Sequence, residues 1–206
     1  MGWFAVPSPV PVDESAIRRI CVFSGSRPGA KAIYRRDAEA LGAAIAARGW
    51  ELIYGGASVG LMGAVADAAL AAGGSVIGII PEALVAKEVA HAKLTSLRVV
   101  KTMHERKAAM HELADAFVAL PGGFGTFEEL FEIVTWAQLG IHRKAVALLD
   151  SGGYFAALIA MVDHAIEEDF VPEDQRALIL SAESVPELIA KLANFRFPAL
   201  RPKWVE

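Results

Sequence analysis

The chain has 206 residues, of which 54% are hydrophobic and 21% are charged. A chain of this size buries roughly 70% of its unfolded surface, and its apolar content excludes disorder over most of its length. The net charge of −4 argues against a broad nucleic-acid-binding surface, and no apolar run reaches the roughly 18–20 residues that a membrane span needs. The single cysteine, Cys21, cannot form an intramolecular disulfide, so we expect a reducing, cytoplasmic environment.

Residues 1–18 are predicted to form an extended or disordered arm, because Pro7, Pro9 and Pro11 favour extended backbone. From residue 19 onward, short apolar runs alternate with longer helical patterns. Strands are predicted at Arg19–Phe23, Glu51–Tyr54, Ser75–Ile80, Leu97–Val100, Ala116–Leu120, Ala145–Leu149 and Leu178–Ser181. Helices are predicted at Ala30–Arg48, Gly60–Ala72, Met103–Glu112, Thr126–Leu139, Tyr154–Glu168 and Val185–Asn194, with a loop at Pro81–Ser96 that holds at most one helical turn. This alternation indicates a single α/β domain over residues 19–206, a Rossmann-like, doubly wound and mostly parallel sheet of about seven strands.

Glycines cluster where predicted strands are followed by helices. Gly25 follows the first strand and the Gly55-Gly56 pair follows the second, while Gly122, Gly123 and Gly125 follow the fifth. Because the carboxyl ends of parallel strands share one edge of the sheet, these clusters predict a ligand crevice along that edge. The Gly152-Gly153 pair is interpreted instead as an ordinary tight turn.

The turn at residues 121–125 joins a buried strand to a helix that is predicted to begin at Thr126. Glycine lets an anion approach the main-chain N–H groups, and the first turn of a helix adds donors and the positive end of the helix dipole. Phosphate is the expected anion. The turn has neither the P-loop pattern nor G-x-G-x-x-G, so it does not support a kinase or a dinucleotide-binding protein.

Two interpretations of Thr126 and Glu129 remain open at this point. Thr-x-x-Glu at a helix start is a capping box, in which Glu129 would fold back onto the backbone N–H of Thr126. Alternatively, Glu129 carries chemistry. The neighbouring Glu128 and Glu132 are expected to be solvated or to complement the helix dipole.

A second charged segment, residues 101–107, follows the fourth predicted strand and places Arg106 and Lys107 near the start of a helix. Cations are disfavoured near a helix N-terminus. Their presence there indicates either anion recognition at the ligand edge or an ordinary solvated face, and the spacing alone does not decide between the two.

Two sequence motifs in this chain resemble those of a known protein family. Residues 121–129, PGGFGTFEE, fit the pattern PGGxGTxxE, and residues 103–107, MHERK, fit MHxRK. In this order, and with Arg106 and Glu129 separated by 23 residues, they resemble the Lonely Guy family of cytokinin riboside 5′-monophosphate phosphoribohydrolases, often labelled lysine decarboxylase-like. The similarity spans roughly residues 19–195, although Arg27-Pro28 replaces the small residues that are more usual in the first loop.

The resemblance implies hydrolysis of the N-glycosidic bond of an N6-modified AMP, giving free base and ribose 5-phosphate. It implies that Arg106 and Glu129 are catalytic, that no organic cofactor is needed, and that the protein is a homodimer. The histidine spacing suggests no metal site. The residues implied to bind substrate or its phosphate are Gly25, Ser26, Gly55, Gly56, Glu88, Lys107, Gly122, Gly123, Phe124, Gly125, Thr126, Phe127, Glu128 and Thr135. The chemistry is consistent, since a carboxylate near C1′ stabilises a ribosyl cation and a paired arginine holds that carboxylate ionised.

Three other functions are weighed against this one. Residues 56–60 match G-x-S-x-G around Ser58, but a serine-hydrolase elbow would not follow the second strand. A pyridoxal phosphate decarboxylase would need Lys107 as its Schiff-base lysine. A non-catalytic nucleotide-binding or carrier protein could use the same fold, and turnover of AMP, as opposed to binding alone, separates it from an enzyme.

Overall fold

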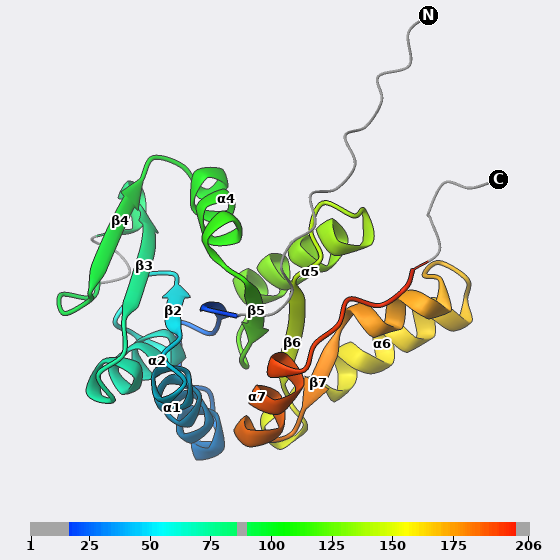
Figure 1. The fold of residues 1–206 in the computed structure, drawn as a ribbon, viewed down its shortest axis with the longest axis horizontal. Helices are drawn as coiled ribbons and strands as arrows, with labels where there is room; N and C mark the ends of the chain where they lie inside the picture. Colours follow the sequence, from blue (N-terminus) through cyan, green and yellow to red (C-terminus); the bar gives the residue numbers. More distant parts are fainter. Residues whose placement is uncertain (1–16, 86–89, 201–206) are drawn as a thin grey trace, which may run out of the picture.

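The computed structural model describes residues 17–85 and 90–200, and its elements alternate between strands and helices (Figure 1). The strands are β1 (Arg19–Phe23), β2 (Glu51–Tyr54), β3 (Val76–Pro81), β4 (Ser96–Val100), β5 (Ala116–Ala119), β6 (Ala145–Leu149) and β7 (Leu180–Ala182). The α-helices are α1 (Ala32–Ala47), α2 (Gly60–Ala71), α3 (Glu82–Val85), α4 (Met103–Leu113), α5 (Phe124–Gln138), α6 (Ala156–Glu167) and α7 (Val185–Ala193), and the 3₁₀ helices are η1 (Ser151–Gly153) and η2 (Glu173–Leu178). Each predicted strand and helix is present, and its ends lie within two residues of the prediction.

The seven strands form one sheet in the order β4-β3-β2-β1-β5-β6-β7. Every neighbouring pair is parallel, so the predicted α/β class is confirmed and the sheet is wholly rather than mostly parallel. The chain builds outward from β1 to β4 and then returns to place β5 on the other side of β1. The strand order therefore reverses between β1 and β5, which is where open parallel sheets bind ligands.

Each face of the sheet has its own hydrophobic core because side chains alternate along a strand. In β1, Ile20 and Val22 join one buried cluster, whereas Cys21 and Phe23 join the other. The first cluster is completed by α1, α2 and α7, and the second by α4, α5 and α6 (Figure 1). Helices cover both faces, which explains why the strands read as continuous apolar runs.

Parts of the predictions fall on residues that the structure does not describe. Residues 1–16 of the predicted arm, the candidate Glu88 and the last six residues of the predicted domain lie outside the described ranges. In the described part of the predicted loop at Pro81–Ser96, α3 forms one helical turn, as expected. Within residues 17–85 and 90–200, no helix is long and apolar enough to cross a membrane.

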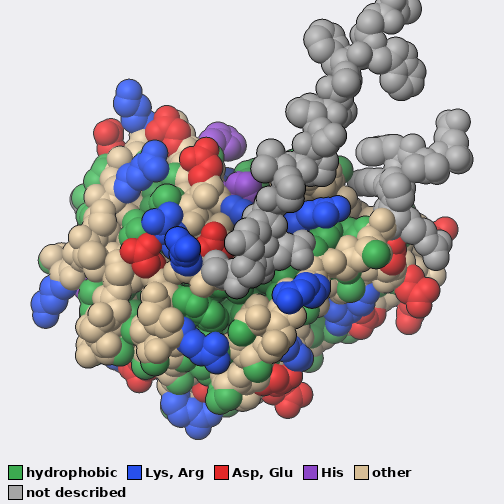
Figure 2. Space-filling view, viewed as in Figure 1, with side chains coloured by type: hydrophobic (Ala, Val, Ile, Leu, Met, Phe, Trp, Pro, Cys, Tyr) green, Lys and Arg blue, Asp and Glu red, His purple; other side chains and the backbone are tan. Residues whose placement is uncertain are grey.

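The charged side chains on the face shown in Figure 2 are mixed in sign. Basic and acidic groups lie next to one another there and do not form one broad basic area.

Candidate active site

Three glycine-containing turns pack against one another at the carboxyl edge of the sheet, as predicted. The Gly25 N–H donates to the Pro121 carbonyl at 3.0 Å, and the Leu61 N–H donates to the Gly25 carbonyl at 2.9 Å. These hydrogen bonds connect the turn after β1 to the turn after β5 and to the start of α2. Backbone of these loops therefore occupies the space above the carboxyl ends of β1 and β5, where the strand order reverses.

The glycines of the β5–α5 turn have two different roles. A Cβ added at Gly122 would lie 2.0 Å from Thr126 Oγ1 and 2.9 Å from the backbone nitrogen of Gly25, so close packing excludes any side chain there. A Cβ added at Gly123 or Gly125 would meet nothing within 4 Å. Gly122 therefore holds the turn together, whereas Gly123 and Gly125 leave backbone open to an approaching ligand.

Helix α5 begins two residues earlier than predicted, and this corrects the capping-box interpretation. Its N-cap is Gly123 and no side chain caps it. Thr126 lies inside the first turn and is buried, with its hydroxyl close to Gly122. Because Thr126 is not the N-cap, Glu129 does not complete a capping box, and the N–H groups of residues 124–126 form the first turn that faces the open side of the glycines.

Glu129 instead faces Arg106 of α4. Arg106 Nη2 lies 3.5 Å from Glu129 Oε1, and the two side chains are only 8% and 13% exposed. Gly55 makes room for this guanidinium, since a Cβ at that position would lie 2.2 Å from Arg106 Nη2. The two residues implied to be catalytic are thus brought together, and Arg106 does not lie on a solvated face.

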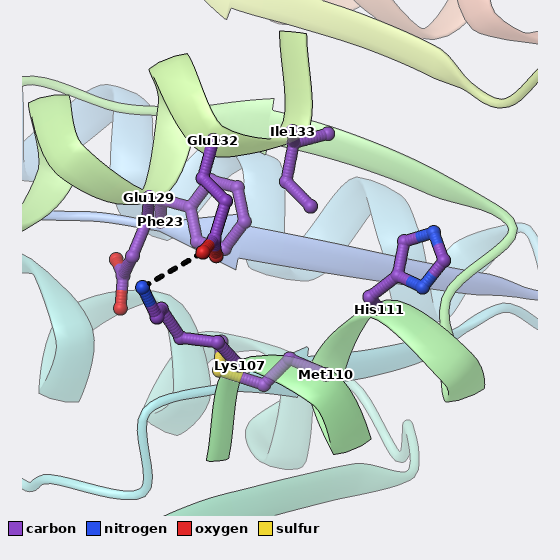
Figure 3. A pocket seen from close by; sticks show the side chains of 7 residues that line it. All are labelled: Phe23, Lys107, Met110, His111, Glu129, Glu132 and Ile133. Carbon is purple, nitrogen blue, oxygen red and sulfur yellow. Dashed lines mark hydrogen bonds and ion pairs between the residues drawn. The ribbon is translucent and has the colours of Figure 1, made fainter. Parts of the chain in front are cut away.

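Lys107, the next residue of α4, bridges two further carboxylates of α5, and Figure 3 shows the contact with Glu132. Its Nζ donates to Glu128 Oε1 at 2.5 Å and to Glu132 Oε1 at 2.9 Å. Burial opposes the charged form of this lysine, but the two carboxylates outweigh that effect and raise the pKa of Lys107. Glu128 is solvated, as expected, at 56% exposure, but it is also ion-paired. Glu132 differs from the expectation, because it is ion-paired and only 23% exposed.

These residues surround a small cavity between α4, α5 and β1. Phe23, Met110, His111 and Ile133 line it together with Lys107, Glu129 and Glu132 (Figure 3). Burial, together with a smaller effect of the nearby Lys144, lowers the pKa of His111 to about 4, so His111 is neutral near pH 7. Among the described residues, no group of three or more His, Cys, Asp or Glu side chains is arranged to hold a metal ion.

Comparisons with known proteins show which family the chain belongs to. A family model described as "Possible lysine decarboxylase" matches residues 62–192. Two proteins of Oryza sativa subsp. japonica, "Probable cytokinin riboside 5'-monophosphate phosphoribohydrolase LOGL9" and "Cytokinin riboside 5'-monophosphate phosphoribohydrolase LOG", are 50% and 49% identical to the chain. These alignments cover 89% and 88% of this chain and 81% and 75% of the relatives. The chain belongs to the Lonely Guy family.

Solved structures of other proteins have a fold similar to that of this chain. The Moco carrier protein from Chlamydomonas reinhardtii has a TM-score of 0.65 and 23% identity, over 85% of this chain and 94% of that one. The molybdenum cofactor binding protein from Rippkaea orientalis has a TM-score of 0.63 and 24% identity, over 85% and 94% of the two chains. At these identities the likeness shows a shared fold alone.

In this Lonely Guy family member, the substrate-binding residues implied by the motifs do not all meet. Gly25, Gly55 and Gly56 lie at the glycine-rich edge, as does Ser26, whose backbone carbon would be 2.3 Å from a Cβ at Gly60. The ring of Phe124 is 93% exposed beside Gly123 and Gly125, and Phe127 is half-buried one turn further on.

Thr135 lies farthest from the glycine turn. Nine residues of α5 separate it from Thr126, which corresponds to about 13 Å along the helix. Its side chain is exposed, and its hydroxyl donates to the Phe131 carbonyl at 2.6 Å. The single chain therefore does not bring Thr135 to the glycine turn.

Two residues that the sequence analysis did not select also belong to this region. Glu132 pairs with Lys107, and the Tyr154 hydroxyl donates to the Gly122 carbonyl. Glu132 could have been found from its position one turn beyond Glu128 on the same helix face. Tyr154 lies more than 30 residues from Gly122 in sequence, and no local pattern indicates their contact.

Proposed function

We propose that this protein hydrolyses the N-glycosidic bond of adenosine 5′-monophosphate, either unmodified or with an N6 substituent, releasing free base and ribose 5-phosphate. The observation that carries the proposal is the buried Arg106–Glu129 pair, 3.5 Å apart, directly beside open glycine backbone at the start of α5. Relatives at 46–50% identity that carry this activity in their names support it.

The glycine turn would hold the phosphate. Phosphate oxygens accept hydrogen bonds from the first-turn N–H groups of α5, where the backbone of Gly123 and Gly125 is open. Glu129 begins the next turn of the same helix, so the anchored ribose lies within reach of its carboxylate. Binding energy from the phosphate thereby places the reacting carbon, which is not itself held by the turn.

The reaction then proceeds at C1′ of the ribose. As the C1′–N9 bond breaks, its electron pair leaves with the base and positive charge develops on the ribosyl group. The Glu129 carboxylate stabilises that charge and orients the water that adds to C1′, and the proton lost by the water passes to the departing base. Arg106 holds Glu129 ionised and in position.

A pyridoxal phosphate decarboxylase does not fit these residues, in spite of the wording of the family description. A Schiff base forms from a free amine. Lys107 is an ammonium group held by Glu128 and Glu132, and its pKa is raised by them. The lysine that this chemistry would need is therefore kept protonated.

The test is release of ribose 5-phosphate from AMP, from isopentenyladenosine monophosphate and from the corresponding riboside. We expect turnover of the monophosphates and little turnover of the riboside, because the glycine turn needs its anion. The ratio of the first two rates determines whether the base pocket prefers bare adenine or a prenyl tail. Equal rates on riboside and monophosphate would contradict the proposal, and binding without turnover would favour a carrier.

We also propose that the protein is a cytoplasmic homodimer. The supporting observation is the exposure of large apolar side chains at both ends of α5: Phe124 at its start is 93% exposed, and Leu139 and Ile141 just beyond its end are 46% and 58% exposed. Exposed apolar side chains of this size favour contact with another subunit. Light scattering should give twice the chain mass, and a monomer at micromolar concentration would contradict the proposal.

A further inference from the structure

A lysine with two carboxylate partners lies directly beside the pair proposed to be catalytic. Lys107 Nζ lies 2.5 Å from Glu128 Oε1 and 2.9 Å from Glu132 Oε1, and the lysine side chain is only 11% exposed. Figure 3 shows the Lys107 side chain reaching between Glu129 and Glu132. Two of its three ammonium N–H donors therefore bind carboxylates of α5. This leaves one donor for the phosphate that the resemblance implies Lys107 binds.

The charges at this contact are unequal in number. Helix α5 places Glu128, Glu129 and Glu132 within little more than one turn, and α4 opposes them with Arg106 and Lys107. Like charges that are one turn apart on a helix repel, and a neighbouring carboxylate raises the pKa of another. Without the charge of Lys107, the ionised form of Glu129 would be opposed by two carboxylates and supported by Arg106 alone.

The other titratable groups that face Glu129 cannot replace this charge. His111 of α4 lines the same cavity, but its pKa is lowered to about 4 and it is neutral near pH 7. Cys21 of β1 is fully buried. Burial is the main cause that raises the pKa of its thiol, and the negative charge of Glu129 raises it further. Lys144 is also close to Cys21 and His111, but its Nζ donates to the His111 carbonyl at 2.6 Å. The cations that pair with the α5 carboxylates are Arg106 and Lys107.

We propose that Lys107 and Glu132 are positioning residues, whose ion pair holds α4 against α5 and balances the carboxylates so that Glu129 stays ionised. This inference rests on the proposed hydrolysis. It gives Lys107 a role that does not require contact with the substrate, and it gives Glu132 a role that neither motif indicates. Removing the lysine should therefore change the pH range of turnover more than it changes nucleotide binding.

The experiment measures kcat for AMP hydrolysis against pH, since the profile of kcat reports groups in the substrate complex. Lys107→Met should move the acid limb of the profile upward by about one pH unit. Glu132→Gln should move it downward, because a carboxylate next to Glu129 is lost. The double variant should return the limb toward the wild-type position, although the bridge is absent, and Lys107→Arg should leave it in place. The phosphate of AMP itself titrates near pH 6, but it is common to all variants and cancels in the comparison.

A matched control is available on α7, where Lys191 Nζ lies 2.7 Å from Glu187 Oε1 on the protein surface. Lys191→Met removes the same kind of ion pair away from the site and should leave the profile unchanged. If Lys107→Met proves unable to fold, Glu132→Gln and Lys107→Arg still decide the question through the position of the acid limb.

Three results would overturn the inference. A Lys107→Met variant that raises KM without moving the acid limb would mean that the lysine binds phosphate and does no more. A double variant that keeps the full shift of Lys107→Met would show that charge balance is not the cause. An acid limb that stays in place in Glu132→Gln would remove the role assigned to that residue. Absence of turnover by the wild-type protein would be distinct from these results, because it would refute the proposed function and the inference with it.

Discussion

Replacing Gly55 with alanine should lower the rate of hydrolysis strongly and change the unfolding free energy little. The added Cβ would lie 2.2 Å from Arg106 Nη2, 3.2 Å from Arg106 Cζ and 3.3 Å from Met62 Sδ. Ordinary contact begins near 3.4 Å, so the guanidinium must move by about 1 Å. The atoms in the way belong to flexible side chains and not to the backbone, and the new methyl group can be accommodated without unfolding.

The displaced group is the partner of Glu129. The present separation of 3.5 Å leaves no room for a shift of this size without losing the alignment of Arg106 with the carboxylate. Within the described residues, Arg106 Nε has no hydrogen-bond partner that would resist the movement. A misplacement of about 1 Å in a catalytic group costs about 10²-fold in rate, while the unfolding free energy should stay within about 1 kcal/mol of wild type.

The assay compares kcat/KM for AMP hydrolysis with the urea midpoint of unfolding, for Gly55→Ala, Arg106→Ala and the double variant. If the methyl group acts through Arg106, it should have little further effect once Arg106 is already alanine, because the two changes then remove the same interaction. Losses that multiply in the double variant would refute the reasoning, as would a Gly55→Ala enzyme with wild-type turnover.

Three further changes have clear expected outcomes. Glu129→Gln should lower kcat by on the order of 10²-fold or more with little change in the unfolding midpoint; a folded variant with near wild-type hydrolysis would remove Glu129 from the mechanism. Gly125→Ala should raise the unfolding free energy by up to about 1 kcal/mol, because its Cβ meets open space inside a helix, and should raise KM because that space is where the phosphate approaches. Burial is the main cause that lowers the pKa of His111 and His142 to about 4, so below pH 6.5 the unfolded chain binds more protons than the folded one and the unfolding free energy should fall toward pH 4. Urea unfolding at several pH values should show a smaller fall in His111→Phe than in wild type. An equal fall in the two proteins would contradict the lowered pKa of His111.

The sequence was sufficient to predict the strands because they are buried on both faces. The bounds of β6, for example, are those predicted, since the apolar run Ala145–Leu149 lies between Lys144 and Asp150. The doubly wound sheet was predicted but the order of its strands was not. The shared edge of the glycine turns was predicted, because it depends only on the strands being parallel.

The start of α5 could not be predicted from its local pattern. The same Thr-x-x-Glu pattern at Thr102–Glu105 is a true cap, in which Thr102 Oγ1 accepts from the Glu105 N–H at 3.1 Å. At Thr126 the hydroxyl instead packs beneath Gly122, and Glu129 faces a residue of α4. The local pattern is the same in the two places, and the contact of Glu129 with Arg106, 23 positions away, is present only at α5.

The position of β1 in the centre of the sheet governs how the protein acquires its site during synthesis. Strand β1 leaves the ribosome first, but its partner in the register Ile20↔Ala116 follows roughly 100 residues later, which is roughly 5 to 20 s at ordinary rates of translation. Through that interval β1 can pair with β2 while its other edge is open to association with other chains. Arg106 and Glu129 emerge close together at the end of this delay, and the docking of β5 both closes the open edge and brings them opposite one another. A nascent chain that stops before Ala116 would therefore lack Glu129 and have no activity, and it would leave the central strand of the sheet exposed to aggregation.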